Sequence, residues 1–179
     1  MQNERTLGTF FGLRFSIIPL FFVGTLIIFA VMSIIGLAVL KLHTADALIF
    51  ALLCTLVHWL GDLVHSAGHA IAARSTGYPM VGLRLGTLGV FGTTLYPDNE
   101  PALPGPTHIR RAVGGPALSL SVAIVLGLIA YLRRADAADI SYMVLVFAVV
   151  ELVAVFGPGA FIPLPFTDGG TLRKWWGKS

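Results

Sequence analysis

The chain has 179 residues, which is enough for one domain. Hydrophobic residues make up 56% of it and charged residues 12%, against roughly 25% charged in a typical globular protein, which argues against an ordinary soluble domain. The formal net charge of +3 is too small to indicate a nucleic-acid partner, and the single Cys54 excludes an intramolecular disulfide. The composition predicts one membrane domain over residues 1–179.

Four apolar segments are expected to cross the bilayer as helices, which needs about 20 residues each. They lie at residues 15–40, 45–73, 112–132 and 140–157. The second is interrupted by His58, Asp62, His65 and His69, and the fourth by Glu151. The fold class predicted is therefore an all-α polytopic membrane protein with four transmembrane helices.

A different pattern separates the second and third segments. Residues 80–96 contain β-branched and aromatic residues, an alternation around Leu83-Arg84-Leu85, and glycines every few positions. This pattern predicts a membrane-associated β-hairpin or small sheet. The proline-rich loop 97–106 is expected to end it.

The distribution of cations predicts the topology. One side of a four-span arrangement carries Arg5, Arg14, Arg74, Arg84, Arg110, Arg111, Arg173, Lys174 and Lys178. The other carries Lys41, Arg133 and Arg134. Because cytoplasmic loops are enriched in Lys and Arg, both termini and the hairpin are expected to face the cytoplasm. Trp175 and Trp176 fit an interfacial anchor, and Arg110 and Arg111 are expected to contact headgroups or cytoplasm.

Four polar residues form a stripe on the second segment. On a helix, His58, Asp62, His65 and His69 fall within a sector of about 60°. Ionisable groups inside a membrane are costly and so are functional candidates. The alternative is a polar seam that holds helices together by hydrogen bonds.

Within this stripe, His65 and His69 are one turn apart, a spacing with which neutral imidazoles bind zinc. Asp168 in "FTDGG" is the candidate third ligand. It is expected in irregular backbone, which at membrane depth must line a cavity or be buried in protein, and Gly169 and Gly170 would let that backbone turn closely. Asp168 could instead belong to a plain turn or helix cap.

Three segments in this order resemble the site-2 protease family of intramembrane zinc metalloproteases: "HSAGHAIAARSTG", "AVGGPALSLSVA" and "IPLPFTDGG". The stretch "LGTFFGLRFSIIPLFF" is similar to the lead-in and first span of small bacterial members, which implies a bacterial plasma membrane. The resemblance implies a Zn²⁺ ion held by His65, His69 and Asp168. It also implies that Gly115 and Pro116 lie in a helix beside the site.

The resemblance further implies an activity, which is hydrolysis of peptide bonds in transmembrane segments. A transmembrane substrate must unwind to expose a peptide bond. The hairpin would then hold the unwound segment as an added strand, so that its backbone stays hydrogen-bonded. The expected partners are the bilayer and a transmembrane protein substrate or client; no sequence feature indicates an oligomeric state.

The sequence departs from the family pattern at the catalytic position. Ser66 stands where the family has the glutamate that acts as general base, and an alcohol is not basic near neutral pH; such groups are worth about 10²–10⁴-fold in rate. Asp62, one turn earlier, could act as a substitute base, bond Ser66, or orient His65, and the last role is favoured. Glu151 could pair with His58 or line the cavity. The asparagines that often precede the family's aspartate are absent before Asp168.

Three functions remain open from the sequence. The protein could be a zinc-binding intramembrane protease that uses Asp62 or another group in place of the glutamate. It could be a pseudoprotease that binds or regulates membrane proteins. A haem or metal-ion carrier is disfavoured, because His58, His65 and His69 share one face of one helix and two of them could hardly bind one haem axially.

Overall fold

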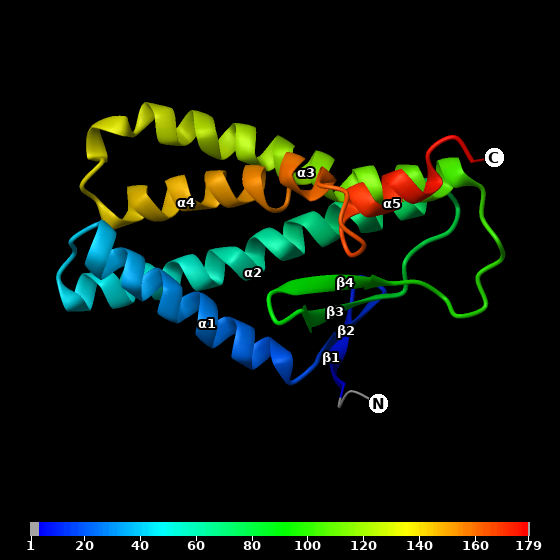
Figure 1. Ribbon diagram of the computed structural model, residues 1–179, viewed down its shortest axis with the longest axis horizontal. Helices are drawn as coiled ribbons and strands as arrows, with labels where there is room; N and C mark the ends of the chain where they lie inside the picture. The colour runs from blue at the N-terminus through cyan, green and yellow to red at the C-terminus, as the bar shows by residue number, and fades with distance from the viewer. Residues whose placement is uncertain (1–3, 179) are drawn as a thin grey trace.

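Four long helices make up most of the protein, and a small sheet lies against one end of them in the computed structural model, which describes residues 4–178 (Figure 1). The helices are α1 Leu20–Ile34, α2 Thr44–Ser75, α3 Gly105–Leu132, α4 Ile140–Ala154 and α5 Asp168–Trp175. The strands are β1 Arg5–Phe10, β2 Leu13–Ile17, β3 Gly82–Thr87 and β4 Phe91–Leu95. A π-helical turn, Ile35–Val39, extends α1, and single 3₁₀ turns lie at Arg134–Asp136 and Pro158–Phe161.

Four of the helical segments are long and apolar enough to cross a membrane. They run over Leu20–Val39, Thr44–Ser75, Gly105–Leu132 and Ile140–Phe161. Large apolar side chains such as Leu26 and Ile124 are about two-thirds exposed, as expected where a helix faces lipid rather than protein. The predicted polytopic helical fold is confirmed, and the chain has the character of a multi-pass membrane protein.

Helix α2 is the centre of the bundle, since it packs against α1, α3, α4 and strand β4. It crosses α3 closely: a side chain at Gly68 would collide with the backbone of Gly114. Both chain ends and the sheet lie at one end of the bundle, and the α1–α2 and α3–α4 connections lie at the other (Figure 1). The polar side chains of α2, such as Asp62 and His69, are buried in this packing.

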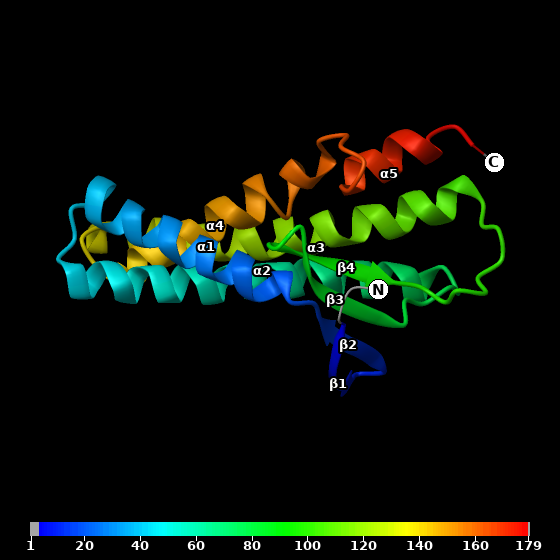
Figure 2. The ribbon, with the colours of Figure 1, turned by 60° about the horizontal axis from the view of Figure 1, so that its bottom comes forward.

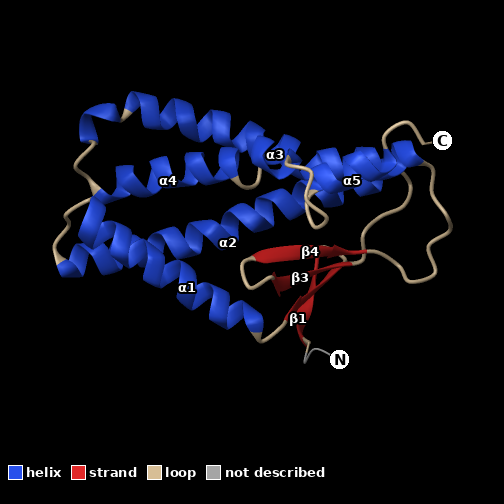
Figure 3. Ribbon diagram, viewed as in Figure 1, coloured by secondary structure: helices blue, strands red, loops and turns tan. Residues whose placement is uncertain are grey.

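The sheet has the strand order β1-β2-β3-β4 (Figure 3). Strands β1 and β2 pair antiparallel, β2 and β3 parallel, and β3 and β4 antiparallel. Strands β3 and β4 are the predicted hairpin. Figure 2 shows that β1 and β2 project away from the bundle, whereas β4 lies along α2. The sheet is thus larger than predicted, because the N-terminal strands join it.

Two predicted span boundaries are wrong. The first span was expected from residue 15, but β2 runs to Ile17 and the helix begins at Leu20, after Pro19. Proline has a φ already suited to a helix start, here −54°, and so separates strand from helix within one apolar run. The third helix begins at Gly105 rather than at residue 112, because Pro106 in the expected loop occupies its first turn.

Candidate metal centre

The polar stripe of α2 lies inside the protein. His58, Asp62, Ser66 and His69 are all less than 8% exposed, and His65 is half-buried. Groups buried this deeply in a membrane-spanning helix need partners, since each unpaired polar atom costs free energy comparable to a lost hydrogen bond. The partners divide the stripe into two ends with different contacts.

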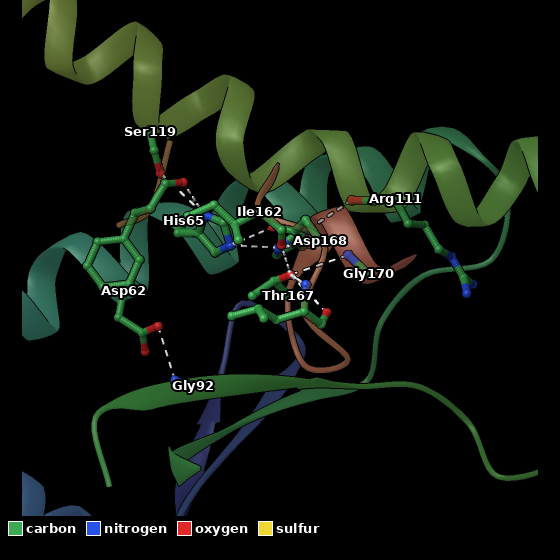
Figure 4. Close-up of polar contacts among 12 residues, drawn as sticks. Asp62, His65, Gly92, Arg111, Ser119, Ile162, Thr167, Asp168 and Gly170 are labelled. Carbon is green, nitrogen blue, oxygen red and sulfur yellow. Dashed lines mark hydrogen bonds and ion pairs between the residues drawn. The ribbon is translucent and has the colours of Figure 1, made fainter. Parts of the chain in front are cut away.

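At one end, three side chains that are far apart in sequence converge. The Nε2 atoms of His65 and His69 lie 2.9 Å apart. Asp168 closes the triangle: its Oδ2 lies 3.2 Å from His65 Nε2 and its Oδ1 lies 3.4 Å from His69 Nε2 (Figure 4). The structure therefore brings together the three predicted ligands, and one atom from each could hold a single metal ion.

The outer ring nitrogens determine what the inner ones can do. His65 Nδ1–H donates to the Phe156 carbonyl at 2.7 Å, and His69 Nδ1–H donates to the Arg111 carbonyl at 2.8 Å. A neutral imidazole has one N–H, so both Nε2 atoms present lone pairs toward each other. Two lone pairs 2.9 Å apart repel unless a cation lies between them. The arrangement is suited to a metal ion on the Nε2 side.

Asp168 was expected to lie in irregular backbone after the fourth span. Instead it is the first residue of helix α5. Thr167 caps α5: its Oγ1 accepts from Gly170 N–H at 3.3 Å and also contacts the carbonyls of Ile162 and Leu164 (Figure 4). The two glycines after Asp168 allow close backbone packing. A side chain at Gly169 or Gly170 would collide with the preceding loop, at the carbonyls of Phe161 or Leu164.

Helix α3 covers the ligands from the other side at Gly115 and Pro116, as the resemblance implied. A Cβ atom at Gly115 would collide with His69 Nε2 and would lie 2.7 Å from His65 Cε1, so only glycine fits here. Pro116 is fully buried. Since proline has no N–H, the carbonyl of Ala112, four residues earlier, receives no helical hydrogen bond from position 116.

Asp62 and Ser66 line a cavity of about 410 Å³ beside the three ligands, and its walls come from α2, β4, the end of α4 and the loop that leads to α5. Asp62 Oδ1 accepts from Gly92 N–H at 3.0 Å, and within residues 4–178 its Oδ2 has no hydrogen-bond partner (Figure 4). The favoured role of Asp62, orienting His65, is wrong, because the Phe156 carbonyl holds His65 Nδ1.

At the other end of the stripe, His58 is fully occupied by protein contacts. Its Nδ1 lies 2.6 Å from Glu151 Oε1, and its Nε2 lies 2.7 Å from the Val90 carbonyl. Of the two expected roles of Glu151, pairing with His58 is found, and neither residue belongs to the cavity wall. His58 has no nitrogen left for the metal centre.

Arg111 is 4% exposed and contacts neither headgroups nor cytoplasm, contrary to expectation. Its guanidinium donates to both carboxylate oxygens of Glu100, at 2.5 and 3.0 Å, and lies over the Tyr96 ring. The hydrogen bond from Arg111 lowers the pKa of Glu100. The pair anchors the residue whose carbonyl holds His69.

Several groups around this site are not indicated by the sequence. The carbonyls of Phe156 and Arg111, and the peptide groups of Val90 and Gly92, belong to the backbone, so no residue type marks them. Thr167 did have a signal, because a threonine directly before "DGG" is a common helix N-cap.

Comparison with known proteins identifies the fold. No protein-family model and no curated protein matches the sequence. Among solved structures, a Site-2 Protease from Methanocaldococcus jannaschii superposes with a TM-score of 0.64, over 96% of this chain and 70% of that chain, at 17% identity. A likeness at this identity establishes the fold. The chain has the site-2 protease fold that its motifs predicted.

Proposed function

We propose that this protein is a zinc-binding relative of intramembrane site-2 proteases that binds transmembrane segments of other proteins, with His65, His69 and Asp168 as the zinc ligands. The observation that carries the proposal is the convergence of two imidazole nitrogens and one carboxylate, with separations of 2.9, 3.2 and 3.4 Å, inside a site-2 protease fold. Two histidines and one carboxylate are also the ligand set of many catalytic zinc sites.

The separations suit tetrahedral zinc. Zinc binds nitrogen and carboxylate oxygen at about 2.0–2.2 Å, so neighbouring ligand atoms in a tetrahedron lie roughly 3.3–3.5 Å apart. The three atoms need to move by only a few tenths of an ångström to reach those values. Both imidazoles are already held by backbone carbonyls, which fixes their orientation and tautomer. When bound, zinc would lower the pKa of a coordinated water and polarise a carbonyl.

The cavity beside these ligands is where a client segment would bind. One wall is the edge of β4, from Phe91 to Thr94, and another is the loop before α5. A transmembrane segment that unwinds loses its helical hydrogen bonds, which is costly in a membrane. Pairing with the edge of β4 would replace those bonds, and apolar side chains such as Phe156 and Ile162 would contact the segment.

The residues around the ligands favour binding over hydrolysis. Ser66 occupies the position of the general base and cannot accept a proton from water near neutral pH. Asp62 is the other acidic side chain besides Asp168 in the cavity wall, and one of its oxygens is bonded to Gly92. A protease that uses Asp62 as its base is the second candidate, because Asp62 Oδ2 has no hydrogen-bond partner within the described residues.

We also propose that both termini and the sheet face the cytoplasm. The supporting observations are that they lie at one end of the bundle and that nine of the twelve cations lie on that side. A cysteine placed at Lys41 should then react with a membrane-impermeant thiol reagent from outside, in a Cys54→Ala background. A cysteine placed at Asp98 should not react.

The test of function uses the wild type, Ser66→Glu and Asp62→Asn, purified in micelles with a model transmembrane substrate, and with zinc measured in each sample. The proposal predicts bound zinc in all three, no cleavage by the wild type, and cleavage by Ser66→Glu. Wild-type cleavage that is lost in Asp62→Asn would establish the second candidate instead. A wild type without zinc would contradict both.

A further inference from the structure

Strand β4 is an edge strand, and two side chains of α2 bond to its free edge. His58 Nε2 lies 2.7 Å from the Val90 carbonyl, just before β4 begins, and Gly92 N–H donates to Asp62 Oδ1 at 3.0 Å. His58 and Asp62 are one helical turn apart. The two backbone groups that they bond flank a single residue, Phe91.

The register of the sheet identifies which groups of β4 face outward. The Leu85 carbonyl accepts from Ile18 N–H, so Leu85 faces β2 and Arg84 faces β4. Arg84 is paired with Thr93, so the peptide groups of Thr93 face β3. Because successive residues of a strand alternate in direction, those of Gly92 and Thr94 face away from the sheet.

The two side chains of α2 take the place of a neighbouring strand. In a parallel pair, one residue donates its N–H to the carbonyl before the opposite residue and accepts from the N–H after it. His58 and Asp62 supply this pair of bonds around Phe91. They therefore occupy the part of the edge nearest the middle of α2. Among residues 4–178, no hydrogen bond to Gly92 C=O or to the peptide groups of Thr94 is found on this side, and both residues line the cavity.

The open part of the edge adjoins the candidate metal centre. A second cavity lies next to the one that Asp62 and Ser66 line. Thr94 lines both cavities, and so do His69 and Asp168. Val90 and His58 line neither. A strand that paired with Thr94 would place its peptide groups next to the metal ligands. A strand that paired further along, at Val90, would have to displace His58 and Asp62.

We propose that Asp62, together with His58, is an edge cap that sets the register of a bound client segment. The cap stops the added strand at Gly92 and confines pairing to Thr94 and the residues after it. This inference rests on the proposed function, since it concerns the same cavity. It assigns Asp62 a positioning role through its Oδ1 acceptor, and it accounts for a carboxylate that is 2% exposed in the middle of a membrane helix.

Contacts from α4 support the cap. Glu151 Oε1 lies 2.6 Å from His58 Nδ1. This contact on the opposite side of the ring fixes the orientation of the imidazole that bonds the Val90 carbonyl. Both groups are buried, with side chains 6% and 10% exposed. Displacing the cap would leave a buried donor or acceptor without a hydrogen bond, which is unfavourable. Residues of α2, α4 and β4 therefore all contribute to the contacts that prevent the client strand from extending past Gly92.

The first test measures amide hydrogen exchange by NMR in the metal-free chain of residues 1–179 in micelles. The cap predicts a protected Gly92 amide and a Thr94 amide that exchanges at least 10-fold faster. Asp62→Ala should accelerate exchange at Gly92 at least 10-fold. Asp62→Asn should not, because its amide oxygen still accepts from Gly92. Wild-type exchange at Gly92 as fast as at Thr94, or equal acceleration by both variants, would overturn the cap.

The second test adds an acetylated apolar tripeptide hydroxamate to the zinc-loaded protein, because hydroxamates bind zinc and the peptide part must then lie in the cavity. Binding is followed by the imidazole signals of His65 and His69. The register predicts slowed exchange at Thr94 with Gly92 unchanged in the wild type and in Asp62→Asn, and a changed Gly92 signal in Asp62→Ala. A bound probe that alters wild-type Gly92, or leaves Thr94 unaffected, would overturn the register.

The two proposals fail in different ways. If the protein binds no zinc and no hydroxamate, the proposed function fails, and amide exchange alone still decides whether Asp62 caps the edge. If zinc and probe both bind but the Gly92 amide is unprotected, the proposed function stands and the edge cap is wrong.

Discussion

The two ends of the polar stripe on α2 contain similar residues at similar spacing, but their contacts differ. At one end, the Nδ1 atoms of His65 and His69 donate to carbonyls, and their Nε2 atoms face each other and Asp168. At the other end, both ring nitrogens of His58 are bonded within the protein, to Glu151 and to Val90. One end is arranged to hold a cation, and the other holds the edge of a strand.

The difference shows that helical spacing alone does not identify a ligand. Histidines four residues apart share a face whether or not they bind metal. The two ends differ in the hydrogen-bond partners of the ring nitrogens. In His65 and His69, a backbone carbonyl bonded to Nδ1 leaves a lone pair on Nε2 for a metal, whereas both nitrogens of His58 already have partners in the protein. Variants at the two ends should therefore have different effects on zinc.

The largest expected effect comes from removing a ligand. His65→Ala should lower zinc affinity by more than about 100-fold, since even the loss of an outer contact of a ligand costs 10–100-fold. His58→Ala should change zinc affinity by less than about 3-fold, because His58 contacts neither the ligands nor the cavity. Zinc retained during competition with a chelator measures both. Equal losses in the two variants would mean that the stripe binds metal as one unit.

Adding a methyl group at either end should have the next largest effect. A side chain at Gly115 collides with His69 Nε2, so Gly115→Ala should weaken zinc binding roughly 10- to 100-fold, from overpacking of about 1–3 kcal/mol. At Gly92 the added carbon would lie 2.5 Å from Asp62 Oδ2. Gly92→Ala should therefore disturb the β4 edge, with faster amide exchange there, while zinc affinity stays near wild type.

Glu100 tests the support of the metal end through Arg111. Glu100→Gln should lower the free energy of unfolding by about 1.5–3 kcal/mol at neutral pH, the range for hydrogen bonds to charged groups. The pKa of Glu100 is lowered in the folded state by its hydrogen bond from Arg111. Its contribution is therefore present above the unfolded pKa, about 4.3, and is lost as pH falls through the folded pKa.

Apparent melting temperatures in micelles check this pH dependence. The difference between wild type and Glu100→Gln should be largest near pH 7 and should shrink below about pH 4.3. A difference that stays constant down to pH 3 would mean that the charge of Glu100 contributes nothing to stability. Arg133→Gln, at a partly exposed site at the opposite end of the bundle, is the control and should have little effect at any pH.

The smallest expected effect is at Thr167, whose hydroxyl caps the helix that begins with Asp168. Thr167→Val should destabilise this cap by about 1 kcal/mol and weaken zinc binding about 5-fold. Thr167→Ser keeps the hydroxyl and should restore wild-type affinity. If serine and valine behave alike, the hydroxyl does not position Asp168.

Much of the fold follows from the sequence, because long apolar runs, the hairpin pattern of residues 80–96 and the ordered motifs each have a direct physical meaning. The N-terminal strands do not follow from the sequence, since Ile17, the last residue of β2, continues without a polar residue into the apolar run of α1. Pro19 is the one local marker of the boundary, and the pairing of β2 with β3 is a contact between residues about 70 apart in sequence.

The site is predictable in its side chains and unpredictable in its backbone. His65, His69 and Asp168 carry recognisable chemistry, so their type and spacing indicated the triad before its geometry was known. The role of Asp62 depends on Gly92, and that of His58 depends on Val90, through peptide groups that every residue possesses. The register of β4 decides which of its peptide groups face α2.

X-ray absorption at the zinc edge of the purified, zinc-loaded protein tests the central claim most directly, because it counts imidazole ligands and distinguishes oxygen from sulfur. The structure predicts two imidazoles and at least one oxygen at about 2.0–2.2 Å, unchanged in His58→Ala. A third imidazole that disappears in His58→Ala, or a spectrum with no histidine around the zinc, would contradict the division of the stripe into a metal end and a strand-binding end.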